Sequence, residues 1–382
     1  MERLITTYQR HRGAALAVLA GVPWPEALAA RVVLLVLGVL TLLLLTLIGW
    51  AVLLRLRRKQ EETHQDALER QWAPLLEDIL ARRRPFWALD DAVAADDITA
   101  FLSFLHRHAM EATPARLPWI RIVARPYLPF APDPLAARTP EQRAFRVHQW
   151  GWLAPPRGDA LLRAALDDAS AFVAMVALRA LIRRRTTRHA ALSASEQRAF
   201  ARTVVNHLPR FKDWRRASMA ALLAQVAAIA RPLRRLFADR RAAPWVRALA
   251  AAALKRLQDA KAAPLAVQLL KRERRLPLQT AALRLLAAVG TRDHVPLLRQ
   301  LCTADNEVIR IRALSTLAHM GDPSDVPLFE RALHDPSQWV ARQAALGLVR
   351  LGHPQALHTL AHSAHARASL AFQVLSHHRL AA

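Results

Sequence analysis

The sequence predicts an all-α protein, an α-solenoid of stacked helical pairs in its architecture, with one N-terminal transmembrane helix. Three observations support this fold class. The 382 residues include only 10 Gly, 2 Tyr and 11 Phe, and Ala, Leu and Arg dominate, so good helix formers far outnumber typical strand formers. One apolar run near the N-terminus is long enough to span a membrane. The C-terminal half repeats a pattern of apolar residues every 31 or 32 positions.

The predicted transmembrane helix covers residues 32–54, which read VVLLVLGVLTLLLLTLIGWAVLL, 23 residues without a charge. A spanning helix needs about 20 such residues. The basic stretch RLRRKQ follows directly, and the positive-inside rule then places the C-terminal bulk in the cytoplasm of a single-pass protein of the inner (plasma) membrane. Residues 1–31 are interpreted as a retained tail, because Pro23, Pro25 and Glu26 interrupt what would otherwise resemble a signal peptide.

Residues 55–157 are predicted to be a helical linker followed by an irregular adaptor region. Residues 61–84 have helical periodicity, which continues the chain away from the membrane. From residue 85 onward, prolines break the pattern every few positions and four tryptophans occur: Trp87, Trp119, Trp150 and Trp152.

The repeats occupy residues 158–382 and are aligned on the helix-ending glycines Gly290, Gly321 and Gly352. Equivalent apolar positions are Leu278, Ile309 and Val340, then Ala282, Ala313 and Ala344, then Leu286, Leu317 and Leu348, all 31 apart. Towards the N-terminus the spacing becomes 32, with the sets Val246, Ala250, Leu254 and Trp214, Ser218, Leu222. A second column precedes the next apolar run: Arg231-Pro232, Ala263-Pro264, Val295-Pro296 and Val326-Pro327. Each unit is therefore predicted to be two helices, the second with Pro in its first turn, and five to six such pairs stack to bury their apolar stripes.

At these residues the chain resembles the HEAT-repeat proteins, specifically the short bacterial repeats named for phycobilisome lyases. The segments DPSQWVARQAALGLVRLGHP and DNEVIRIRALSTLAHMGDPSDVPLFERAL carry the pattern, from about Asp213 to the C-terminus, with a looser unit at DASAFVAMVALRALIRRR. The resemblance implies a binding scaffold of bacterial origin. It is specific for fold and unspecific for partner.

Motifs for chemistry are missing from the sequence. It has no phosphate-binding Gly loop, no dinucleotide Gly motif, no nucleophile elbow and no Cys pair, so we predict neither an enzyme nor a cofactor nor catalytic residues. His358 and His362, with His365 nearby, have spacing suited to zinc, but no acidic or Cys ligand is close in sequence, and no metal is predicted. The single Cys302 cannot form an internal disulfide and suits a reducing compartment.

The formal net charge of +25 is concentrated in the middle repeats, since residues 171–300 hold 27 Lys or Arg against 6 Asp or Glu. Arg215, Arg247 and Arg310 follow the first apolar residue of their repeats, and we predict that they bind a partner on the concave face. The alternative interpretation is that arginine stems cover the apolar flanks of an Arg-biased protein.

These observations predict a membrane-anchored scaffold or adaptor that binds a protein partner, acidic or membrane-associated, and holds it at a membrane complex. Envelope or polysaccharide machinery is the expected client. The alternative is a polyanion binder that uses the basic middle repeats for anionic lipid or nucleic acid. The predicted anchor and the absence of a row of stacking aromatics argue against nucleic acid as the partner.

Overall fold

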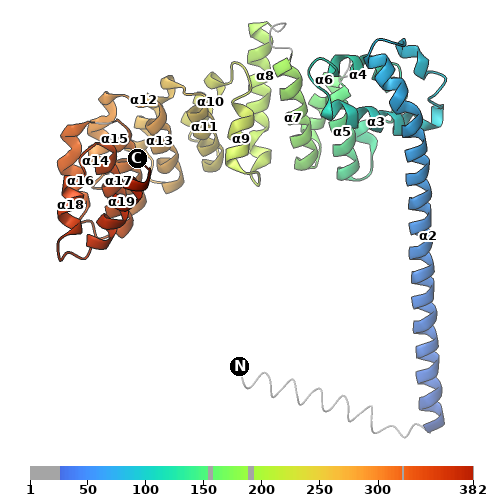
Figure 1. Ribbon diagram of the computed structural model, residues 1–382, viewed down its shortest axis with the longest axis horizontal. Helices are drawn as coiled ribbons and strands as arrows, with labels where there is room; N and C mark the ends of the chain where they lie inside the picture. The colour runs from blue at the N-terminus through green and yellow to red at the C-terminus, as the bar shows by residue number, and fades with distance from the viewer. Residues whose placement is uncertain (1–25, 154–157, 188–192, 321, 382) are drawn as a thin grey trace. The chain divides into compact units, whose positions relative to one another are not determined.

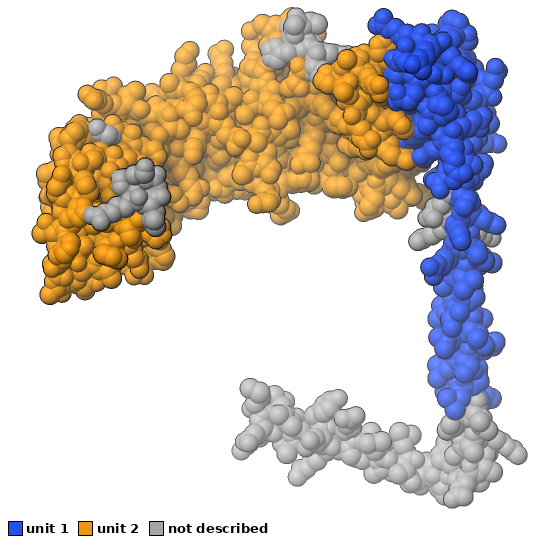
Figure 2. All heavy atoms as spheres, viewed as in Figure 1, with its two compact units in different colours: residues 1–104 blue, residues 105–382 orange. Residues whose placement is uncertain are grey.

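The computed structural model describes residues 26–153, 158–187, 193–320 and 322–381, and every regular element in them is an α-helix or a 3-10 helix. This confirms the predicted all-α class. The chain divides into two compact units, residues 1–104 and 105–382 (Figure 2). Most of the predicted N-terminal tail, residues 1–25, lies outside the described residues.

Unit 1 is dominated by α2 (Glu26–Leu80), one continuous helix of 55 residues (Figure 1). Its described part includes Leu35–Leu56, 22 residues with a mean hydropathy of 2.6, none of them buried, so α2 is long and apolar enough to cross a membrane. The hydroxyls of Thr41 and Thr46 donate to carbonyls of the preceding turn, Leu37 at 2.9 Å and Leu43 at 2.8 Å. An apolar environment therefore meets few unsatisfied polar groups along this segment.

The C-terminal part of α2 enters a small aromatic core within unit 1. Trp72 is buried and meets Phe101 edge-on at 5.0 Å and Phe104 at 5.7 Å between ring centroids. Its indole N–H donates to the carbonyl of Ala92 at 2.9 Å. Phe101 and Phe104 belong to α3 (Ile98–Glu111), within which the division between the units falls, and η1 (Phe86–Leu89) and η2 (Ala95–Asp97) precede it.

Unit 2 contains α4 (Leu117–Ala124), η3 (Leu128–Phe130) and η4 (Pro134–Ala136), and then helical pairs whose first and second helices form two rows (Figure 1). The first helices are α5 (Pro140–Leu153), α7 (Ala171–Thr187), α9 (Arg216–Leu223), α11 (Pro244–Arg256), α13 (Leu276–Val289), α15 (Glu307–Met320), α17 (Gln338–Arg350) and α19 (Ala368–Ala381). The second helices are α6 (Gly158–Ala164), α8 (Ala194–His207), α10 (Ala230–Ala238), α12 (Ala263–Arg272), α14 (Val295–Leu301), α16 (Val326–Ala332) and α18 (Gln355–Ala361). Pro264, Pro296 and Pro327 lie in the first turns of α12, α14 and α16, as the second sequence column predicts.

The core of unit 2 is the buried stripe of the first helices. All nine apolar residues of the last three aligned repeats, and Val246, Ala250 and Leu254, are at most 2% exposed. Alanine at the middle position lets neighbouring first helices approach closely, and α11, α13, α15 and α17 pack in sequence. The periodicity therefore identified the core correctly from α11 onward.

The sequence alignment is wrong at α9. Ser218 is exposed, and Trp214 and Leu222 are only half-buried, whereas Met219, Ala220 and Leu223 enter the core. The correct equivalents of Ala250 and Leu254 thus lie 31 residues earlier rather than 32. A slip of one position rotates a helical residue by about 100°, which is enough to move it off the buried face.

The helix ends follow two different geometries. Gly352 ends α17 in the left-handed region with φ +76°, and the N–H of His353 donates to the carbonyl of Leu348 at 2.9 Å. Gln258, which replaces the glycine in the α11 repeat, adopts φ +51° and the same bonding pattern. Gly290 has φ −69° instead, and a Cβ there would lie 2.5 Å from the carbonyl oxygen of Leu286. Gly321 lies outside the described residues.

Candidate functional site

Arg310, one of the three predicted partner-binding arginines, links two turns inside the solenoid. Its Nε and Nη2 donate to the carboxylate of Asp335 at 2.8 and 2.9 Å. Its Nη1 donates to the carbonyls of Ala304 and Asp305, both at 2.9 Å. Asp335 lies in the turn after the second helix of the same repeat, and Ala304 and Asp305 lie in the turn before its first helix. One guanidinium therefore connects the two ends of a helical pair.

Arg247 has the same function in the α11 repeat. It is 5% exposed, its Nη1 pairs with Glu273 at 3.1 Å, and its Nε donates to the carbonyl of Phe237 at 3.1 Å. Burial opposes ionisation of Glu273, but hydrogen bonds from the backbone of Arg275 and from Arg247 outweigh it, and the net pKa of the carboxyl is lowered.

The same ion pair occurs at α5, upstream of the predicted repeat region. Arg143 donates to the carboxylate of Asp168 at 2.8 and 3.0 Å, and this hydrogen bonding lowers the pKa of Asp168. Helix α5 also packs on α7, and Gly151 permits this approach because a Cβ there would lie 2.5 Å from the Cβ of Ala180. Repeat-like stacking thus includes α5, within the region that the sequence assigns to the adaptor.

Arg215 differs from the other two arginines, because it is exposed at the N-cap of α9. Its neighbour Arg216, also exposed, is the true equivalent of Arg247 once the α9 alignment is corrected. The structure does not bring Arg215, Arg247 and Arg310 together as one surface. Partner binding by these residues stays a prediction, and the internal ion pairs give Arg247 and Arg310 a structural reason for their periodic positions.

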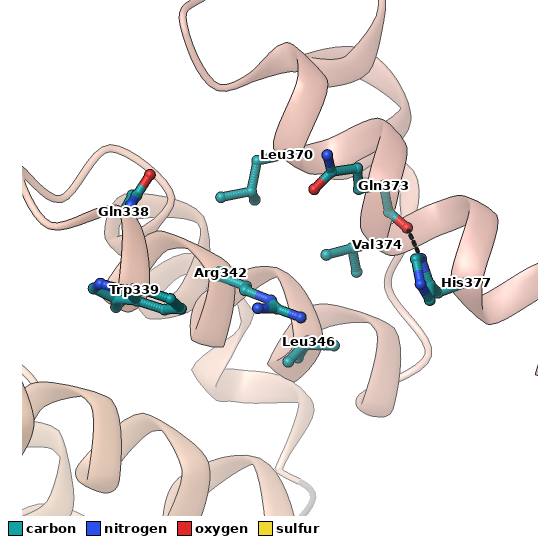
Figure 3. Close-up of a pocket in the computed structure, with 8 residues that line it drawn as sticks. All are labelled: Gln338, Trp339, Arg342, Leu346, Leu370, Gln373, Val374 and His377. Carbon is teal, nitrogen blue, oxygen red and sulfur yellow. Dashed lines mark hydrogen bonds between the residues drawn. The ribbon is translucent and has the colours of Figure 1, made fainter.

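The C-terminal first helices α17 and α19 enclose a groove of about 310 Å³ (Figure 3). Its lining residues are Gln338, Trp339, Arg342 and Leu346 from α17 and Leu370, Gln373, Val374 and His377 from α19. Trp339 is 55% exposed and Leu346 is 44% exposed, although both are large apolar side chains. Among the described residues no carboxylate lines the groove, and Arg342 contributes a positive charge beside the indole.

Sequence reasoning missed this groove, although a signal was present. Trp339, Arg342 and Leu346 are spaced i, i+3 and i+7, which places them on one helix face. That face lies beside the buried stripe formed by Val340, Ala344 and Leu348. Trp339 and Leu346 are therefore apolar residues that the core does not bury.

A hydrogen-bonded chain of aromatic rings lies between α3 and α5 within unit 2. The indole N–H of Trp152 donates to Nε2 of His148 at 3.2 Å, and Nδ1 of His148 lies 3.1 Å from Nε2 of His106. Because an indole can only donate, neutral His148 carries its proton on Nδ1 and donates to His106. Burial first, then the neighbouring His148 and Arg183, lowers the pKa of His106 to about 4.

The histidines considered for zinc do not form a cluster with acidic or Cys ligands. Nδ1 of His362 bonds to the carbonyl of His358 at 2.8 Å, and Nε2 of His365 lies 3.3 Å from Nδ1 of His334. Across the described ranges, no group of three or more His, Cys, Asp or Glu side chains is placed to hold a metal ion.

The stacked helical pairs of unit 2 define the class of protein, an α-solenoid built from repeats. Residues 276–348 and 304–371 match the family model for HEAT repeats. Residues 276–371 of the chain therefore consist of HEAT repeats, which confirms the resemblance seen in the sequence. No curated protein matches the chain.

Two solved structures illustrate this similarity. The complex of CpcE and CpcF of phycocyanin lyase from Nostoc sp. PCC7120 is 18% identical, with 65% of this chain and 86% of that chain covered and a TM-score of 0.28. An engineered protein is 16% identical, with 82% and 95% covered and a TM-score of 0.37. Both superpositions are loose, and the fold assignment depends on the repeat match and the helix packing.

Proposed function

We propose that this protein is a membrane-anchored scaffold that binds an acidic segment of a partner protein in the groove between α17 and α19. HEAT repeats generally serve as protein-interaction scaffolds. The observation that supports the site is the exposed pair Trp339 and Leu346 beside Arg342. Tryptophan and arginine are the residue types most enriched at binding hot spots, and a central apolar anchor with a polar rim is the usual arrangement.

The chemistry of the groove favours an amphipathic partner segment with one large apolar side chain and a nearby carboxylate. The apolar side chain would pack on Trp339 and Leu346, and the carboxylate would pair with Arg342. The chain's net charge of +25 and the absence of a carboxylate among the described lining residues both favour an acidic partner.

Helix α2 supports the membrane part of the proposal. An anchor raises the effective concentration of the scaffold near membrane-bound clients, which increases avidity without any new contact. The basic residues after the apolar segment favour a cytoplasmic solenoid in a bacterial inner membrane. C-terminal fusions test this topology: we expect a fluorescent-protein fusion to be fluorescent and an alkaline-phosphatase fusion to be inactive, and the opposite pair of results would reverse the orientation.

Partner binding is tested with the full chain, purified from native membranes in mild detergent. We expect the double variant Trp339→Ala/Leu346→Ala to lose a specific acidic protein at least tenfold. The single variant Arg342→Glu should lose the same protein. Phe172→Ala is the matched control, because Phe172 is 49% exposed on α7 and lies outside the groove. Equal recovery by all variants, with helicity unchanged, would remove the groove from the proposal.

A further inference from the structure

A second groove lies between the second helices α8 and α10, and arginine dominates it. Its volume is about 570 Å³. The lining residues are Ser195, Arg198 and Arg202 from α8, Ala228 from the preceding turn, and Ala230, Arg231, Pro232, Arg234 and Arg235 from α10. Residues four apart on a helix share a face, so Arg198 and Arg202 lie together on one wall, as do Arg231 and Arg235 on the other.

Only one of these five arginines is neutralised within the described part of the chain. Arg234 donates to both carboxylate oxygens of Asp259, at 2.7 and 2.8 Å. The described residues provide no ion pair or side-chain hydrogen bond for Arg198, Arg202, Arg231 or Arg235, all of which are exposed. The described residues that line the groove include no carboxylate. Like charges four apart on a helix repel each other, so an anion that binds here relieves repulsion on both walls.

Helix α10 adds a second favourable feature, because it begins at Ala230 inside the groove. The first amides of a helix have no intrahelical acceptor and form its positive end. Pro232 has no N–H and the amide of Leu233 donates to the carbonyl of Ile229, so the positive end of α10 consists of the amides of Ala230 and Arg231 at the groove.

We infer that the α8–α10 groove binds a compact, multiply charged phosphate group, such as a diphosphate or the phosphate headgroup of an anionic lipid. Guanidinium forks match phosphate oxygens in bidentate geometry. The volume is within the range of small-ligand sites. An acidic peptide is disfavoured, because the lining offers only Ala and Pro apolar groups and therefore no anchor pocket like that of the α17–α19 groove. This site is independent of the proposed partner groove.

The experiment uses the full chain in neutral-detergent micelles at 0.15 M salt, titrated calorimetrically with inorganic pyrophosphate. We expect saturable binding that weakens at least tenfold in Arg198→Ala/Arg202→Ala and in Arg231→Ala/Arg235→Ala. The control is Lys271→Ala/Arg272→Ala, which removes the same charge from exposed positions at the end of α12. The control should stay within about twofold of the parent, since it changes only the long-range field.

Two further titrations distinguish the sources of the phosphate and the type of recognition. Dihexanoyl phosphatidic acid, a soluble lipid, replaces pyrophosphate in one series; tighter arginine-dependent binding of this lipid indicates a headgroup, and tighter binding of pyrophosphate indicates a soluble ligand. Arg198→Lys/Arg202→Lys keeps the charge but removes the bidentate fork, and we expect it to lose affinity several-fold. Absence of saturable binding by both probes, or an equal loss in the Lys271/Arg272 control, overturns the inference.

Discussion

Replacing Arg310 by Ala is expected to destabilise the α15 repeat strongly, although the sequence predicts a partner-binding role for this residue. The variant loses two charge-assisted bonds to Asp335 and two bonds to the carbonyls of Ala304 and Asp305. Both side chains of the ion pair are mostly buried, with 15% and 13% of their area exposed. Hydrogen bonds to charged groups are worth about 1.5–3 kcal/mol, and breaking a fully buried pair costs about 3–5 kcal/mol, so a loss of about 2–3 kcal/mol is expected here.

Hydrogen exchange read peptide by peptide is the suitable assay, because solenoids open locally and a single unfolding free energy describes them poorly. A loss of 2–3 kcal/mol corresponds to a roughly 30- to 140-fold fall in protection, and it should be concentrated in α15 and α17. Arg215→Ala is the matched control, since Arg215 is exposed and such substitutions stay within about 0.5 kcal/mol.

A double-mutant cycle with Asp335→Ala isolates the ion pair from the lost packing of the arginine stem. We expect a coupling energy of about 1–2 kcal/mol between Arg310 and Asp335. The structural explanation of the arginine row is refuted if the amides of α15 exchange as slowly in Arg310→Ala as in Arg215→Ala. A coupling energy near zero between Arg310 and Asp335 would refute it as well.

Three further predictions concern single residues. Gln258→Gly should stabilise the protein by about 0.5–1 kcal/mol, because glycine has no Cβ penalty at φ +51°. Gly352→Gln should destabilise it for the same reason. Urea midpoints of the two variants that shift in the same direction would contradict this prediction. Burial raises the pKa of Cys302 to about 12, so little thiolate is available in the folded chain at pH 8. Ellman's reagent should therefore react at least 100-fold faster with the urea-unfolded chain than with the folded chain. Comparable rates would place the thiol at the surface. Burial lowers the pKa of His106 to about 4, so between pH 6.5 and 4 the unfolded chain binds a proton that the folded chain does not. The contribution of His106 to the free energy of unfolding should be complete above pH 6.5 and should fall by up to about 3 kcal/mol towards pH 4. A His106→Leu variant whose stability depends as steeply on pH would refute this assignment.

The fold was largely predictable from the sequence wherever the repeat carried long helices. The stripe of Leu278, Ala282 and Leu286 recurs in each later repeat, and all its members are buried, because only one face of a stacked helix can reach the core. The error at α9 has a physical cause. That helix has only eight residues, and Trp214 in the preceding turn is apolar enough to imitate the first core position.

Trp214 is held in that turn by contacts that no repeat template contains. It is half-buried against the core, and the guanidinium of Arg179 lies 5.3 Å from the centroid of its ring. A large aromatic side chain can satisfy both a core and a cation, so periodicity alone does not assign it.

The two grooves differed in how far sequence could predict them. Trp339 and Leu346 are off the core stripe of α17, so inspection of helix faces would have identified the groove's apolar wall. The α8–α10 groove is different, because its walls come from helices of consecutive repeats. Arg198 and Arg231 are 33 residues apart, and only tertiary packing of the second helices places them on one groove.

One spacing of charges recurs among the structural arginines of unit 2. Five arginines each pair with a carboxylate 25 or 26 residues further along the chain: Arg143, Arg234, Arg247, Arg299 and Arg310. Arg143, Arg247 and Arg310 lie on first helices, and Arg234 and Arg299 lie on second helices, so the same spacing occurs in both rows. Of the five arginines in the α8–α10 groove, only Arg234 has such an acid, and it is the only one that is neutralised within the described residues. An Arg-biased composition alone gives no reason for unpaired arginines to gather at one place. The four remaining groove arginines nevertheless lie together on facing walls of one groove. Their common position, and not the net charge of the chain, is the reason to expect a bound anion between α8 and α10.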